Sequence, residues 1–152
     1  MDKKLARQRL AKLWFIASGF LLLLFVIYTA TNRFDNHNAE GWQWYTQSIF
    51  PSLTLISAFY FTAHPDDLNL LIDEFAFRLA YGISAGYLAV IILTVLLAPL
   101  SFKYAHLSIL ETFHQSQLYL TIFQGLVTAS IGWLFGKAKA KKLPGMAKMK
   151  AG

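Results

Sequence analysis

The chain contains no cysteine, and this absence removes several kinds of chemistry before any motif is considered. Disulfide bonds, zinc–thiolate centres and cysteine nucleophiles are all excluded. Charge is also scarce, because only 14% of the residues are charged while 56% are hydrophobic and the mean hydropathy is +0.44. A soluble domain of this composition would expose more apolar surface than it could bury. The composition therefore indicates a protein whose solvent is the lipid bilayer.

Charged residues are missing altogether from four long stretches of the sequence. They are Leu13–Asn32, Gly41–Pro65, Leu79–Phe102 and Thr112–Gly136. Each is long enough to cross a bilayer as an α-helix at about 1.5 Å per residue. The sequence therefore predicts an all-α fold, an integral membrane four-helix transmembrane bundle over residues 13–136. The expected helices span about 13–31, 42–63, 68–98 and 112–136, which leaves no room for a soluble domain.

The basic residues gather at the two ends of the chain, where they form an expected N-tail (1–12) and C-tail (137–152). Five lie in the N-tail and six in the C-tail, which makes 11 of the 14 in the chain, whose net charge is +6. The positive-inside rule then predicts a cytoplasmic (inner) membrane protein with both termini in the cytoplasm and an even number of crossings. The basic tails are interpreted as signals that set this topology, with contact with anionic lipid headgroups as the alternative, and nucleic acid is not an expected partner.

An acidic segment separates the second and third expected helices. Its carboxylates are Asp66, Asp67, Asp73 and Glu74. Apolar residues recur between them at helical spacing, and Glu74 and Arg78 have the i,i+4 spacing of an ion pair. The pattern predicts an amphipathic cytoplasmic extension preceding the third helix, with Asp66 or Asp67 as its cap. Its acidic face is interpreted either as a solvated surface or as a docking site for a basic cytoplasmic partner or for the basic tails of the protein itself.

Small residues form a stripe along the fourth expected helix at intervals of four, three and four. The stripe consists of Gly125, Ala129, Gly132 and Gly136, and the third helix carries a shorter GxxxG pair, Gly82 and Gly86. Small residues let two helix backbones approach closely, which favours association in lipid. The sequence leaves two partners open, namely the third helix of the same chain or a second copy.

A polar stripe runs beside the small one with the same spacing. It consists of Gln117, Thr121, Gln124 and Thr128. A glutamine in hydrocarbon needs hydrogen-bond partners, so a lipid-facing orientation is unfavourable. One hypothesis is a clamp between helices, with Ser52, Thr54, Ser57 or Thr62 of the second helix as partners. The alternative is the wetted lining of a pore formed by several copies.

Two further features concern the second helix. Trp42, Trp44 and Tyr45 stand at its start, where aromatic rings form a belt at the membrane interface. Pro51 lies inside its apolar run, so the helix either begins near Ser48–Pro51 or continues through a kink from about Trp42.

Catalytic and metal-binding groups are sparse. No acid or base falls at membrane depth, where proton relays and ion paths need one. The histidines are expected on opposite sides of the membrane, His64 in the cytoplasm and His37, His106 and His114 outside. Glu111 and His114 have the spacing of four-helix carboxylate sites, which require two such pairs and two more Glu. We therefore expect no catalytic residue, no metal and no cofactor.

These features together predict a non-enzymatic membrane module. The leading hypothesis is an anchor or effector that self-associates or binds a cytoplasmic partner. The alternative is an oligomeric channel or membrane-disrupting pore lined by the polar stripe.

Overall fold

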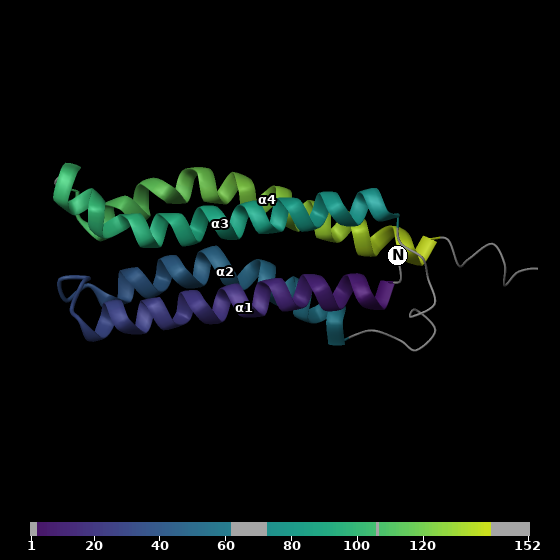
Figure 1. Ribbon diagram of the computed structural model, residues 1–152, viewed down its shortest axis with the longest axis horizontal. Helices are drawn as coiled ribbons and strands as arrows, with labels where there is room; N and C mark the ends of the chain where they lie inside the picture. Colours follow the sequence, from purple (N-terminus) through teal and green to yellow (C-terminus); the bar gives the residue numbers. More distant parts are fainter. Residues whose placement is uncertain (1–2, 62–72, 106, 141–152) are drawn as a thin grey trace, which may run out of the picture.

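The computed structural model describes residues 3–61, 73–105 and 107–140. These residues form four α-helices and no strand, which confirms the all-α prediction. The helices are α1 (Lys3–Ala30), α2 (Asn38–Phe61), α3 (Glu74–Ala105) and α4 (Ile109–Ala140). Figure 1 shows them side by side in an elongated bundle, in which α1 packs mainly against α2 and α3 mainly against α4.

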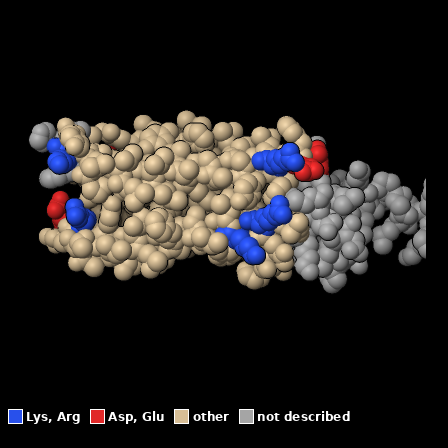
Figure 2. Space-filling view, viewed as in Figure 1, with Lys and Arg blue, Asp and Glu red and all other residues tan. Residues whose placement is uncertain are grey.

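Three of the helices are long and apolar enough to cross a membrane. The candidate spans are Leu5–Ala30, Glu74–Ser101 and Ile109–Phe135. On the face seen in Figure 2, the charged side chains gather at the two ends of the bundle and leave its middle uncharged. This distribution is typical of a membrane protein, because charge at bilayer depth is costly. The first half of α2 carries Glu40, Gln43 and Gln47, and this helix is not among the three candidate spans.

The helices extend beyond the ranges that the sequence predicted. α1 begins at Lys3, inside the expected N-tail, and α4 continues to Ala140, inside the expected C-tail. Ala6, Leu10 and Trp14 explain the early start of α1, because they recur every four residues and are all buried. A long run without charged residues marks the part of a helix that can lie in the hydrocarbon core of the membrane. The helix itself can continue beyond that run.

Neither internal proline ends its helix. α2 runs through Pro51 from Asn38, so the alternative of a continuous helix is the observed one. The predicted end of the third helix before Pro99 is wrong, since α3 continues to Ala105.

A proline lacks an N–H and leaves the carbonyl four residues earlier without its helical donor. For Pro99 this carbonyl belongs to Val95, and it accepts a hydrogen bond from the Tyr28 hydroxyl at 2.8 Å. A side chain of α1 thus replaces the donor that α3 lost, which is how proline is accommodated in membrane helices.

The turn after α1 positions an aromatic side chain in the core. Asn32 adopts a positive φ of 51°, and its N–H bonds to the Thr29 carbonyl at 3.1 Å. The N–H of Arg33 bonds to the Tyr28 carbonyl at 2.9 Å, which completes a Schellman motif with asparagine in the position usually held by glycine. The chain then places Phe34 in the bundle, where this ring is buried.

An aromatic cluster fills this end of the bundle. Its central ring is Phe25, which lies within 5.9 Å, centroid to centroid, of five other rings. Those rings are Phe34, Trp42, Trp44, Tyr45 and Phe113.

The predicted interfacial belt is therefore wrong for Trp44 and Tyr45, each only 3% exposed. α2 starts at Asn38, before the aromatic run, so its first turns already lie against α1 and α4. A Cβ on Gly41 would lie 2.9 Å from the Phe34 ring, which explains glycine at that position.

Candidate functional site

A polar groove runs between α2 and α4, and we call it the α2–α4 groove. It consists of two cavities of about 260 and 190 Å³ that share Gln47 and Gln117. The larger one also includes Tyr87 and Gln124, whereas the smaller one leads to Glu40. Amides, hydroxyls and backbone carbonyls therefore follow one another from the end of the bundle toward its middle.

The inner part of the groove is organised by Pro51. Because proline has no N–H, the Gln47 carbonyl lacks its helical donor, and Gln124 Nε2 donates to this carbonyl at 3.1 Å. The same amide lies 3.5 Å from the carbonyl oxygen of Ser48, which also accepts the Tyr87 hydroxyl at 2.7 Å. α3 and α4 thus both donate to the backbone of α2 beside its proline.

Gln117 joins the two helices about two turns of α4 further out. Its Nε2 donates to Gln47 Oε1 at 2.7 Å. The hydrogen-bond clamp between the helices is therefore present, but its α2 partners are Gln47 and Ser48. The sequence predicted side-chain hydroxyls of α2 as the partners. Ser52, Thr54 and Ser57 make no hydrogen bond to Gln117 or Gln124. Thr62 lies outside the described residues.

The two threonines of the polar stripe do not join the clamp. Thr121 is exposed, and its hydroxyl donates to the Gln117 carbonyl of its own helix at 2.7 Å. Thr128 is exposed on the surface of α4. The stripe is therefore divided, because the glutamines bond to α2, whereas Thr121 lies at the exposed edge of the groove and Thr128 on the outer surface.

The small residues lie on the outside of the bundle. A Cβ placed on Gly82, Gly86, Gly125 or Gly132 would meet no atom within 4 Å, and Ala129 is exposed. Gly136 lies near the end of α4, among the residues whose side chains are not described. The structure therefore does not bring these glycines against another helix of the chain. The buried faces of α3 and α4 carry larger side chains, such as Ile91 and Ile131.

Glu111 and His114 do not act together. The N–H of Ser108 donates to Glu111 Oε2 at 2.7 Å, and the N–H of Glu111 donates to Ser108 Oγ at 3.1 Å. This is a capping box at the start of α4, which accounts for the acidic residue. His114 instead faces Glu40 across the groove, with Nε2 at 3.7 Å from Oε2. His106 is not described, and no three metal-ligating side chains gather among the residues that are.

The acidic residues before α3 are described in part. The carboxylate of Asp73 accepts the N–H of Phe75 at 3.1 Å and so caps α3. The predicted pair of Glu74 with Arg78 is confirmed at 2.6 Å. Asp66 and Asp67 lie outside the described residues, and so does the expected cap at either of them.

Comparisons of this chain with models of protein families, with curated proteins and with solved structures find no match. What this site can do is therefore judged from the chemical groups that line the groove. Its inner part offers amide and hydroxyl groups from Gln47, Gln117, Thr121, Gln124 and Tyr87. These groups form hydrogen bonds and polarise water, but none of them is a general acid or base near neutral pH.

The proline-dependent clamp makes a prediction about coupling between two substitutions. Gln124→Leu alone should lower the free energy of unfolding by about 0.6 kcal/mol, the mean for hydrogen bonds between membrane helices. In a Pro51→Ala background the same change should have nearly no effect, because the alanine N–H can serve the Gln47 carbonyl. A double-mutant cycle of unfolding free energies in detergent measures this coupling.

Pro99→Ala provides the matched control, because Pro99 frees the Val95 carbonyl, which Tyr28 serves. In the Pro99→Ala background, Gln124→Leu should lower the free energy of unfolding by as much as it does in the wild type. Equal costs of Gln124→Leu in all three backgrounds would show that Pro51 does not create the acceptor.

Proposed function

We propose that the chain crosses a bacterial-type cytoplasmic membrane four times, with both termini in the cytoplasm. α2 has 24 residues, and at 1.5 Å per residue its length of about 36 Å exceeds a hydrocarbon core of about 30 Å. Its polarity is offset locally, because the exposed Gln47 gives its Oε1 as an acceptor to Gln117 Nε2 of α4 at 2.7 Å. The Lys- and Arg-rich ends of the sequence support this orientation through the positive-inside rule.

Reporter fusions test this topology. Cytoplasmic reporters should be active after Lys12, within Asp66–Glu74 and after Lys142. Periplasmic reporters should be active only near Asn36–Asn38 and Ser108–His114. If α2 lay along the surface and did not cross, the reporter within Asp66–Glu74 would be active on the periplasmic side, and the four-crossing proposal would be abandoned.

The functional proposal is a non-enzymatic membrane module that self-associates through the outer face of α4. The observation that carries it is the open space at Gly125 and Gly132, where a Cβ would meet no atom within 4 Å. Close contact between small residues stabilises helix pairs in lipid, and no other helix among the described residues contacts Gly125 or Gly132. A second copy is the partner that such a face fits.

Exposed hydroxyls on α4 support the same proposal. Thr121 and Thr128 lie on the surface of the helix beside the small residues. The Thr121 hydroxyl already donates to the Gln117 carbonyl of its own helix, and a helix of a second copy can donate to its oxygen in addition, which lipid tails cannot do. A contact through this face would therefore combine close packing with polar pairing.

Extraction in mild detergent followed by native mass measurement tests the proposal. We expect a mass that is an integer multiple of the 17.2 kDa chain. A lone chain under the mildest conditions would contradict self-association. A second protein retained in stoichiometric amount would favour the anchor that binds a cytoplasmic partner, for which the acidic segment is the candidate surface.

A pore is the second candidate, and the polar lining of the α2–α4 groove favours it. Several copies would have to close this groove around water. The bonds of Gln117 and Gln124 to α2 support the clamp instead, because both amides already have protein partners. Single-channel currents that vanish in Gln124→Leu, with assembly unchanged, would favour the pore.

A further inference from the structure

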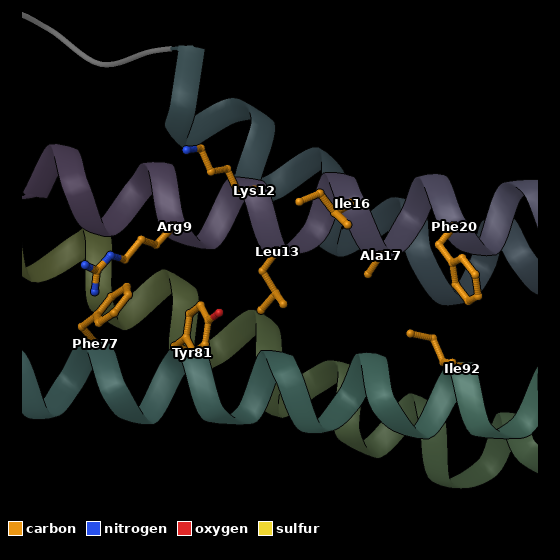
Figure 3. A pocket seen from close by; sticks show the side chains of 9 residues that line it. All are labelled: Arg9, Lys12, Leu13, Ile16, Ala17, Phe20, Phe77, Tyr81 and Ile92. Atoms are coloured by element: carbon orange, nitrogen blue, oxygen red, sulfur yellow. The ribbon is translucent and has the colours of Figure 1, made fainter.

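An apolar groove lies between α1 and α3, separate from the α2–α4 groove, and we call it the α1–α3 groove (Figure 3). Its volume is about 750 Å³. Sites that bury small ligands usually measure about 300–1,000 Å³. Leu13, Ile16 and Phe20 of α1 face Phe77, Tyr81 and Ile92 of α3 across it. The groove is therefore large and apolar enough for a hydrocarbon chain.

Two cations stand at one end of this groove. Figure 3 shows Arg9 extending from α1 toward Phe77, and Lys12, about one turn further along α1, directed away from α3, whereas Phe20 and Ile92 lie at the far end. Both cationic side chains are exposed, and neither forms an ion pair with a carboxylate in the described part of the chain. The groove thus combines positive charge at one end with an apolar interior.

The length of the groove fits one leaflet of a bilayer. Arg9 and Phe20 are eleven residues apart on α1, which corresponds to about 16 Å along the helix axis. Half of a hydrocarbon core of about 30 Å is about 15 Å. A molecule with its head at Arg9 would therefore reach the end of the groove near the middle of the membrane.

We infer that the α1–α3 groove binds one anionic phospholipid. The phosphate accepts charge-assisted hydrogen bonds from Arg9 and Lys12, and an acyl chain lies along Leu13, Ile16 and Phe20. The lysine-rich C-terminal segment of the sequence has the same sign as these cations and does not compete for the site. The inference requires insertion in a membrane but not self-association.

Lipid titration of the purified full-length protein, followed by native mass spectrometry, tests this inference. The probes are phosphatidylglycerol and phosphatidylcholine with identical acyl chains. Wild type should retain one phosphatidylglycerol tightly and phosphatidylcholine more weakly. The double variant Arg9→Gln/Lys12→Gln should bind phosphatidylglycerol roughly 25-fold more weakly, since each cation near an anionic membrane surface contributes about a fivefold step. Its affinity for phosphatidylcholine should fall less, because the choline cation already offsets the charge of the phosphate in that lipid.

The matched control is Lys103→Gln, which removes an exposed charge near the other end of α3. Its phosphatidylglycerol affinity should equal that of the wild type. An equal loss in the control would show general attraction of an anionic lipid and would overturn the inference. An unchanged affinity in the double variant would do the same, as expected if the chain's own carboxylates neutralise Arg9 and Lys12.

Discussion

Replacing Gly132 with isoleucine is expected to convert the associated protein into monomers while leaving the helix bundle folded. Within one chain the new side chain meets open space, because no described atom outside the adjacent backbone of α4 lies within 4 Å of the Cβ position. Between two chains it would hold the backbones apart along about one helical turn. We expect association to weaken on the order of 100-fold, measured by energy transfer between labelled copies in lipid vesicles.

Gly19→Ile is the matched control, since Gly19 on α1 also faces open space. This variant should associate like the wild type, and both variants should unfold at the wild-type temperature in a detergent that dissociates the copies. Two outcomes would count against the proposal. One is loss of folding in Gly132→Ile, and the other is an equal loss of association in the control.

Removal of the central aromatic ring should have the largest effect on stability. Phe25 is fully buried and contacts rings from α2, α4 and the turn after α1. Phe25→Ala would leave a cavity that three rigid segments cannot close, and its expected cost is about 3–5 kcal/mol. Thermal unfolding in detergent, followed by tryptophan fluorescence, measures this loss.

Phe15→Ala is the control on the same helix, because Phe15 is 46% exposed. The change removes the same atoms without opening a buried cavity, so it should cost less than about 1 kcal/mol. Similar losses in the two variants would mean that the aromatic cluster does not hold this end of the bundle together.

The sequence predicted the number of helices better than their limits. Long charge-free runs indicate hydrocarbon, and they located all four helices. They did not indicate that α1 begins at Lys3 or that α3 passes through Pro99 to Ala105. Those limits depend on tertiary contacts, such as the hydroxyl of Tyr28 that serves the Val95 carbonyl.

The α2–α4 groove was also predicted only in part, because its hydrogen bonds depend on tertiary contacts. The spacing of Gln117 and Gln124 predicted a clamp, because buried amides need partners. It did not predict Gln47 and Ser48 as those partners, although Pro51 marks the Gln47 carbonyl as lacking its helical donor. Helical periodicity assigns residues to a face, but in lipid it does not show whether that face meets lipid or protein.

The same limit applies to residues that the sequence did not single out. Tyr87 donates to α2, and Arg9 and Lys12 stand at an apolar groove. No short motif marks either arrangement, because each depends on helices far apart in the sequence. Arg9 and Lys12 were predicted only as members of a basic tail.

Single-cysteine crosslinking in native membranes tests most directly whether copies meet through the outer face of α4. The chain has no cysteine, so one introduced thiol can form a disulfide only with a second copy or another protein. Such a bond requires Cα atoms within about 7 Å, which only closely packed backbones provide. Ala129→Cys should yield a disulfide-linked dimer on mild oxidation, whereas Leu23→Cys, at an exposed position on α1, should remain monomeric. If Ala129→Cys does not crosslink, or if both variants crosslink equally, copies do not meet through the outer face of α4.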